Sequence, residues 1–304
     1  MLSAVRHVAA CIATGPSAPR ALSAVCARLD PGSMVVAPSA RMPLTEPAVP
    51  PGLYMADLSV VAGSAGAELA PLWPALVAVL VAGELATGAA SSLPSHLPVL
   101  LHAVCVHLDG APSGAQTAVT AAAVQVYRAV VSQAEEHAAG ADKGIDEPES
   151  QAAASAEPAG LSELVQLFGG GPEQSGSDRA PSARGLRNPS APAGDGNSSP
   201  NARLVALFLR PAAQLHPAVV ERWGEVALRW AASGPVRRTA CRSFEVLRAL
   251  APAPTASMLA DMLARLAGTA SDPSGEIQQY AHEILRTLVA YIPRLSDELL
   301  AQVY

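Results

Sequence analysis

Three histidines, His96, His102 and His107, fall within twelve residues of one apolar stretch and are the first candidates for a metal site. A metal ion needs ligands that converge at about 2 Å. On an α-helix, His102 lies about 240° around the axis from His96, and His107 lies about 140° from His102. Because these side chains diverge, the spacing does not predict a metal site, and we interpret them as ordinary surface or interface histidines.

Patterns for a catalytic nucleophile or a phosphate loop are equally weak. Ser243 follows Cys241 and Arg242, but it belongs to no GxSxG elbow and no histidine lies near it in the sequence. We therefore interpret Ser243 as a small residue at a helix–helix contact. The run Gly-Gly-Gly-Pro at 169–172 is not followed by Lys-Ser or Lys-Thr, so it does not form a phosphate loop. The sequence predicts neither a catalytic residue nor a cofactor, and we expect the chain not to be an enzyme.

Arginines in the C-terminal third are the best candidates for a binding surface. They are Arg229, Arg237, Arg238, Arg242 and Arg248. Guanidinium groups bind carboxylates and phosphates bidentately, so this set could hold an acidic segment of a partner protein. The alternative is helix capping and pairing within the chain, with Glu225, Glu245 and their neighbours. Trp223 and Trp230 share a helix face and are expected to be core anchors rather than an exposed binding hot spot.

Composition argues against several other classes of protein. Half of the residues are hydrophobic but only 4% are aromatic, and Ala, Leu, Arg and Glu are frequent, which favours helix over strand. The net charge is −6, and only residues 203–304 are slightly basic, with 11 basic and 9 acidic groups, which is too weak for a nucleic-acid-binding surface. The four cysteines form no CxxC pair and are expected to be buried, reduced thiols of a cytosolic protein.

The residues above must be positioned by helices, since apolar residues recur at helical spacing along two parts of the chain. We predict one helical block at 53–137 and a second at 203–304, separated by a disordered Gly/Pro/Ser/Ala-rich linker at 138–202. Within this linker, a short amphipathic stretch at 161–168 is expected to dock onto a neighbouring helix, the alternative being a disordered recognition motif. Residues 1–52 form an N-terminal helical or loop segment without a clear assignment.

The pattern predicts an all-α fold, an armadillo/HEAT-like helical repeat or α-solenoid. Helix starts recur at about 40 residues, near Pro217 and Met258, a period that suits such repeats. On the last full helix, Leu285 is expected to face the core and Glu283 the solvent. The predicted helices lie at 53–63, 71–87, 96–108, 114–135, 216–232, 236–249, 255–267, 275–290 and 295–303.

Two segments bear on where the protein resides. The N-terminal residues contain Arg, Ser and Ala and no acidic residue before Asp30, which fits an organellar transit peptide; the alternative is a short helical hairpin broken at Gly15-Pro16. Leu69–Ala86 is the one candidate for a membrane span. Prolines, a glycine and Glu84 leave it an apolar run shorter than the roughly 20 residues that a span needs, so a buried helix is the better interpretation.

Several segments resemble the middle region of the large Furry-type cell-morphogenesis proteins. The most specific resemblance runs from Trp223 to Leu285, within RWGEVALRWAASGPVRRTACRSFEVLRAL (222–250) and MLADMLARLAGTASDPSGEIQQYAHEIL (258–285). HLPVLLHAVCVHLD (96–109) and LYMADLSVV (53–61) resemble the same region. Members of this family are far longer than this chain, which stops inside a helical pattern, so we expect it to be a piece of a longer protein.

The resemblance implies an armadillo/HEAT-like α-solenoid, in agreement with the helical spacing. It also implies a non-enzymatic scaffold that supports NDR/LATS-type kinases and their MOB coactivators in polarised growth and cell shape. Such a scaffold would act in the cytoplasm and at the cell cortex or growth sites. The alternative function is an α-solenoid adaptor in transport or in an organelle, which a transit peptide would favour. Neither reading involves a cofactor, a metal, a nucleic acid or a membrane span.

Overall fold

The computed structural model describes residues 2–29, 73–108, 113–141, 159–168, 200–233, 237–269 and 275–299. Within these residues the chain is built from helices and contains no strand, which confirms the all-α prediction. The predicted helix at 53–63 lies outside the described residues, as do residues 300–303 of the one predicted at 295–303. The helices are α1 (Leu2–Ala13), α2 (Ala18–Leu29), α4 (Trp73–Gly88), η3 (Ala90–Ser92), α5 (Leu93–Leu108), α6 (Ser113–Ala141), α7 (Ala159–Phe168), α8 (Pro200–Leu215), α9 (Val219–Ser233), α10 (Arg237–Leu250), α11 (Ala256–Thr269), α12 (Gly275–Tyr291) and η6 (Ile292–Arg294).

The ends of the helices follow ordinary capping chemistry. α8 begins at Pro200, whose fixed φ suits the first turn of a helix. Before α11, the hydroxyl of Thr255 accepts a hydrogen bond from the amide of Met258 at 3.2 Å, as an N-cap does. α10 ends where Ala251 adopts a left-handed φ of 46° and donates its amide hydrogen to the carbonyl of Leu247 at 3.0 Å. These local signals end the helices at the proline-containing turns that the sequence predicts.

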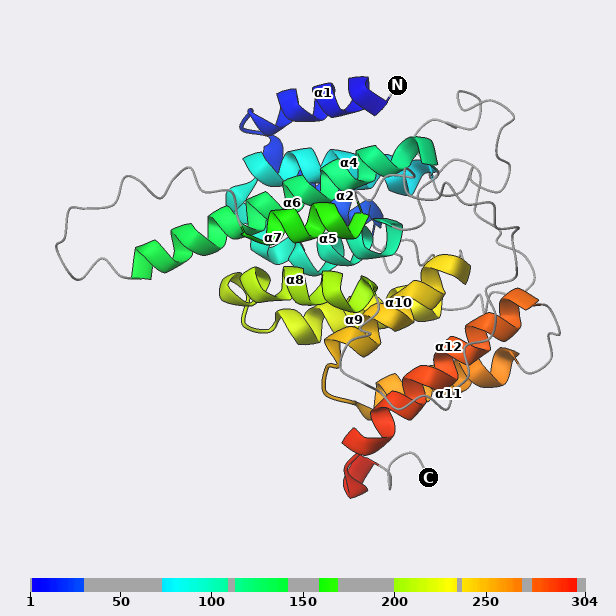
Figure 1. The fold of residues 1–304 in the computed structure, drawn as a ribbon. Helices are drawn as coiled ribbons and strands as arrows, with labels where there is room; N and C mark the ends of the chain where they lie inside the picture. Colours follow the sequence, from blue (N-terminus) through cyan, green and yellow to red (C-terminus); the bar gives the residue numbers. More distant parts are fainter. Residues whose placement is uncertain are drawn as a thin grey trace.

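The helices stack along one direction, so that neighbours in sequence are mostly neighbours in space (Figure 1). α1 lies at one end of the stack, against α4, and the pair α11 and α12 lies at the other. Between them, α4 packs on α6, α5 packs on α9, and α9 pairs with α10. α9 and α11 begin at Val219 and Ala256, in agreement with the predicted period of about 40 residues. The chain is an armadillo/HEAT-like α-solenoid.

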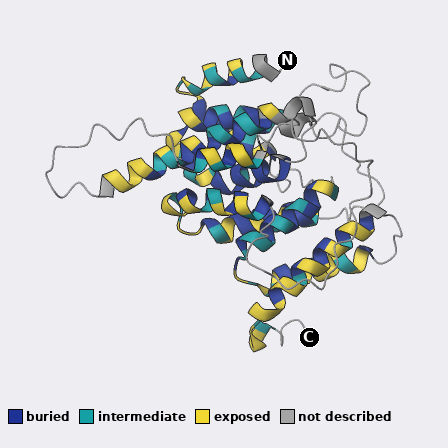
Figure 2. Cartoon of the chain, in the orientation of Figure 1, coloured by how far each residue is buried: buried dark blue, intermediate teal, exposed yellow. Residues whose placement is uncertain are grey.

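One hydrophobic core runs through the stack. It includes Leu22 of α2, Leu101 of α5, Phe208 of α8 and Ile284 of α12. In Figure 2 the buried residues concentrate in the middle of the stack, whereas the helices at both ends expose much of their surface. The helices on either side of residues 142–199 share this core, since α5 contacts α8, α9 and α10. The limits of the two predicted blocks and of the linker stay a prediction.

Two helices lie in or beside the predicted linker. The amphipathic stretch predicted at 161–168 forms α7, which packs against α6 and α8. α8 has no counterpart among the predicted helices. The Pro- and Ser-rich residues before it, together with Pro211 inside it, obscure its helical periodicity in the sequence.

The face that α12 turns to the core differs from the predicted one. Glu283, expected to face the solvent, is 5% exposed, whereas Leu285, expected to face the core, is 45% exposed. Tyr280 and Tyr291 also lie on the core face, beside Ile284. The rotation has a physical cause, because α10 offers a partner for a buried carboxylate at this position, as described below.

The N-terminal residues form the helical hairpin that was the alternative to a transit peptide. Leu22 and Cys26 of α2 are buried in the core. Arg6 of α1 forms an ion pair with Glu84 of α4, with Nε and Oε1 2.7 Å apart. Because both helices contribute to the packed stack, the structure favours the hairpin.

The membrane-span candidate at 69–86 falls largely on α4, whose described residues are mostly buried. Among the described residues, no single helix has both the length and the apolar character needed to cross a membrane. Val77–Gly88 and Ala90–His107 reach the length and apolar character of a membrane span only when taken together. The chain bends by 109° between them.

Candidate functional site

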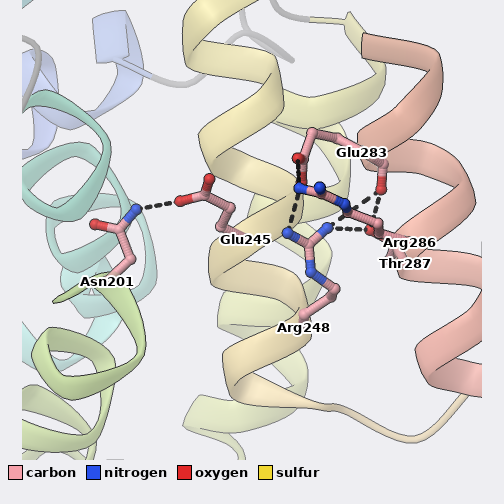
Figure 3. A network of polar contacts seen from close by, with 6 residues as sticks. All are labelled: Asn201, Glu245, Arg248, Glu283, Arg286 and Thr287. Carbon is pink, nitrogen blue, oxygen red and sulfur yellow. Dashed lines mark hydrogen bonds and ion pairs between the residues drawn. The ribbon is translucent and has the colours of Figure 1, made fainter. Parts of the chain in front are cut away.

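Arg248 reaches from the last turn of α10 to α12, where several polar groups hold it (Figure 3). Its guanidinium donates to Oε2 of Glu283 at 2.6 Å, to the main-chain carbonyl of Glu283 at 3.2 Å and to the hydroxyl of Thr287 at 2.8 Å. Arg286 donates to the other carboxylate oxygen of Glu283 at 2.9 Å. Both oxygens of this buried carboxylate are therefore occupied by arginines, which suits a structural ion pair and not a general acid or base.

A second polar link runs from α10 toward α8. The side-chain amide of Asn201, near the start of α8, donates to the carboxylate of Glu245 (Figure 3). Glu245 and Arg248 lie one turn apart on α10. Through these two residues, α10 is hydrogen-bonded to α8 on one side and to α12 on the other, so the cluster joins three helices of the stack.

The other candidate arginines contact different neighbours. The guanidinium of Arg237 lies over the ring of Tyr280 on α12, 5.0 Å from its centre. Arg242 donates to the main-chain carbonyl of Val106 on α5 at 3.4 Å. Arg237, Arg242 and Arg248 therefore each contact another helix of the chain, as the intramolecular alternative expects. The partner of Arg248 is a residue of α12, and neither Glu225 nor Glu245.

The remaining two candidates are exposed. Arg229 lies on α9 and Arg238 lies on the first turn of α10, and both side chains reach the surface. Arg237 and Arg248 face α12 whereas Arg242 faces α5, so these three guanidinium groups point to different neighbours. A partner-binding role for them stays a prediction.

A histidine and a serine that are 141 residues apart in sequence meet in the core. Nε2 of His102 on α5 lies 2.9 Å from the hydroxyl of Ser243 on α10. That hydroxyl donates its hydrogen to the carbonyl of Thr239 at 2.8 Å, so it accepts from His102. A histidine that donates to a serine cannot remove the serine's proton, and both residues are fully buried. Ser243 is the small residue at a helix–helix contact that the sequence predicts.

Of the surface and interface positions expected for the histidines of α5, His102 and His107 take interface positions between helices, whereas His96 is half-buried. His102 and His107 are buried, and their rings lie edge-on to Trp230 at centre distances of 5.0 and 6.1 Å. Burial lowers the pKa of His102 to about 3, with the nearby His107 adding to the effect. Burial and the charge of Arg242 lower the pKa of His107 to about 4. Both imidazoles are therefore neutral at physiological pH. Trp223 is also buried, so the two tryptophans are the predicted core anchors.

Three of the four cysteines, Cys26, Cys105 and Cys241, are buried, and Cys11 is exposed; all four are free thiols. Burial raises the pKa of Cys26 to about 12 and that of Cys241 to about 11. Buried thiols with such pKa values are not nucleophiles. In the described part of the chain, no group of three or more His, Cys, Asp or Glu residues could hold a metal ion.

The outer face of α12 and the start of η6 carry an apolar stripe. Leu285, Val289 and Ile292 are 45%, 62% and 61% exposed, and their spacing places them on one side of the helix. Exposed apolar stripes of this kind mark contact surfaces more often than catalytic ones. The outer face of α12 is therefore left uncovered in the described part of the chain, whereas His102, Ser243 and Glu283 are buried.

Comparisons with known proteins agree with one another. Residues 198–278 match the family described as the cell morphogenesis central region. The cell polarity protein mor2 of Schizosaccharomyces pombe is 45% identical over 87 residues, which are 28% of this chain and 4% of that protein. The cell morphogenesis protein PAG1 of Saccharomyces cerevisiae is 45% identical over 73 residues, which are 24% of this chain and 3% of that protein. The chain thus spans a small part of the length of these relatives.

No solved structure matches the chain. The matched residues run from just before α8 into the start of α12, so they contain the link between Asn201 and Glu245 but not Glu283, the partner of Arg248. They also contain the whole of the segment 222–250, while 53–61 and 96–109 lie outside the matched range. Over residues 198–278 the chain is similar to the central region of cell morphogenesis proteins, which confirms the resemblance to the Furry-type family found in the sequence.

Proposed function

We propose that this chain is part of a non-enzymatic α-solenoid scaffold that serves cell morphogenesis by binding other proteins. The observation that carries this proposal is the 45% identity to a cell polarity protein over 87 residues. That level of identity over packed helices supports a shared surface as well as a shared fold. The proposed place of action is the cytoplasm, at the cell cortex or growth sites.

A scaffold also agrees with the state of the reactive groups. His102, Ser243 and Glu283 are buried and bonded to neighbouring helices, so no substrate reaches them within the described structure. Exposed features of the described C-terminal helices include the apolar stripe of α12 and the arginines Arg229 and Arg238. These are the features with which helical repeats bind partner proteins.

The proposed partners are a kinase of the NDR/LATS type and its MOB coactivator, which the family resemblance implies. An acidic partner segment could pair with Arg229 and Arg238 at the surface, because guanidinium groups bind carboxylates and phosphates bidentately. This assignment of partner and surface is our proposal.

The test is affinity purification of the tagged chain from its own cells, followed by mass spectrometry. We expect an NDR/LATS-type kinase and a MOB protein in the purified material. The variant Arg229→Glu/Arg238→Glu should lose them, and Arg20→Glu/Arg128→Glu, on exposed positions of α2 and α6, should not. Absence of any such kinase, or import into an organelle with cleavage near residue 30, would contradict the proposal.

A further inference from the structure

α7 is a short helix held by few contacts. Its ten residues pack against α6 and α8, with Leu161 and Leu164 buried and Val165 48% exposed on the outer side. By comparison, α8 buries four apolar residues in the core: Leu204, Val205, Phe208 and Ala212. Isolated helices shorter than about 12 residues are marginal in water, so α7 owes its helical state to the surface on which it lies.

That surface selects a small residue at one position. A side chain at Gly160 would place its Cβ 2.0 Å from the hydroxyl oxygen of Tyr127 on α6 and 2.8 Å from a methyl carbon of Leu207 on α8. The ring of Tyr127 is itself fixed by an edge-on contact with Phe208 of α8, at a centre distance of 5.6 Å. α6 and α8 therefore form a continuous surface with a place for glycine followed by two leucines.

One ion pair sets the direction of α7 on this surface. Glu163 of α7 and Arg203 of α8 lie 3.1 Å apart, and both side chains are about half exposed. Such an exposed pair adds little affinity, but it favours one orientation of the helix over the reverse. The surface therefore recognises the pattern Gly-Leu-x-Glu-Leu, found at residues 160–164.

We propose that α6 and α8 form a docking surface for short amphipathic helices with this pattern, and that α7 is its resident ligand. α7 leaves the surface by local unfolding, because two buried leucines hold it less firmly than the core holds α6 and α8. A partner helix that carries a small residue, two leucines and an acidic residue at the same spacing then binds in its place. Tyr127 and Leu207 contact the position of the small residue, and Arg203 pairs with the acidic residue.

A labelled peptide of residues 159–168 tests the surface directly. In fluorescence anisotropy, it should bind the full chain carrying Leu161→Asp/Leu164→Asp, in which the resident helix is disabled. It should bind the unaltered chain at least about tenfold more weakly, because the tethered helix competes at high effective concentration. Equal binding to both chains, or no binding to a variant whose circular dichroism matches the unaltered chain, would overturn the proposal.

Peptide variants test the recognition pattern. Leu164→Ala in the peptide should weaken binding by about 10- to 100-fold, which is the effect of leaving out one buried leucine. Gly160→Ala should raise the helix content of the free peptide and still weaken binding. Gln166→Ala, at an exposed position, is the control and should bind as the original peptide does. A Gly160→Ala peptide that binds more tightly would show that helix propensity, and not fit to Tyr127, decides the affinity.

Hydrogen exchange of the unaltered chain tests release of α7 without any variant. Amides of α7 should exchange at least about tenfold faster than those of α6 and α8, through an opening that is insensitive to low urea. Exchange as slow as in α8 would overturn the proposal even if the variants fail to fold. None of these readouts involves a kinase, so this inference and the proposed function can fail independently.

Discussion

At the scale of single residues, the polar groups of this chain serve to join helices. His102 and Ser243 connect α5 to α10, and Arg248 and Glu283 connect α10 to α12. Each contact pairs residues that are far apart in sequence, and each is buried or partly buried. Ionisable groups in such positions make the stability of the stack depend on pH and on the presence of both partners.

The buried histidines predict a loss of stability in mild acid. The folded-state pKa values of His102 and His107 are lowered to about 3 and about 4, below the ordinary value of 6.5. Between these pKa values the unfolded chain binds protons that the folded chain does not bind. The free energy of unfolding is therefore unaffected by the two histidines above pH 6.5 and falls as the pH drops toward 4. With two histidines the slope approaches about 2.7 kcal/mol per pH unit.

Urea unfolding between pH 7.5 and 5 measures this slope. The double variant His102→Gln/His107→Gln should flatten it, whatever its own stability at pH 7.5. His137→Gln, at an exposed position of α6, is the matched control and should leave the slope unchanged. An unaltered slope in the double variant would show that other groups cause the acid sensitivity.

Removing one partner of the buried ion pair should be costly. Arg248→Ala leaves the buried carboxylate of Glu283 with Arg286 as its remaining cation, and that side chain is 69% exposed. We expect the free energy of unfolding to fall by about 3–5 kcal/mol, measured by urea denaturation. The double variant Arg248→Met/Glu283→Leu should lose less, since no unpaired charge remains. Arg265→Ala, on the exposed face of α11, should change stability by about 0.5 kcal/mol or less.

At the scale of helices, one residue in the turn after α10 has a backbone conformation that is unfavourable for its side chain. Ala251 adopts a φ of 46°, a left-handed conformation that glycine takes without steric cost. We expect Ala251→Gly to raise the free energy of unfolding by about 0.5–1 kcal/mol. Thermal or urea unfolding measures the change. Ala253→Gly, an exposed position in the same turn without positive φ, should not stabilise the chain.

The helices that could be predicted from sequence are those with a clear apolar stripe. α9, α10 and α11 begin and end within a few residues of the predicted limits, because proline and glycine mark their turns. α8 was missed because Pro200 and Pro211 resemble loop residues when no neighbouring helix is known.

The candidate site could not be predicted in the same way. Glu283 points to the core because it pairs with Arg248, which lies 35 residues away on another helix. The contact of His102 with Ser243 joins residues that are 141 apart in sequence. Local spacing carries no information about either pair. The five arginines were predicted as a set from their residue type and their position in the C-terminal third. In the structure, Arg237, Arg242 and Arg248 each make a different contact.

At the scale of the whole molecule, the described helices share one core, so they should unfold together. Leu101 of α5 is fully buried, and the adjacent His102 contacts Trp230 of α9. Leu101→Ala should lower stability by about 2–5 kcal/mol. Because the core is continuous, the urea midpoints by tryptophan fluorescence and by circular dichroism should shift equally. A fluorescence midpoint that stays in place while the dichroism midpoint moves would show two independent units.

The links that α10 makes to α8 and to α12 also limit how the stack can bend. Leucines slide past one another at small cost, but charge-assisted hydrogen bonds lose their energy when donor and acceptor rotate out of line. Glu245 and Arg248 anchor α10 in both directions at once, so tilting either neighbour breaks one of the two links. The two links therefore resist any change in the curvature of the stack between α8 and α12.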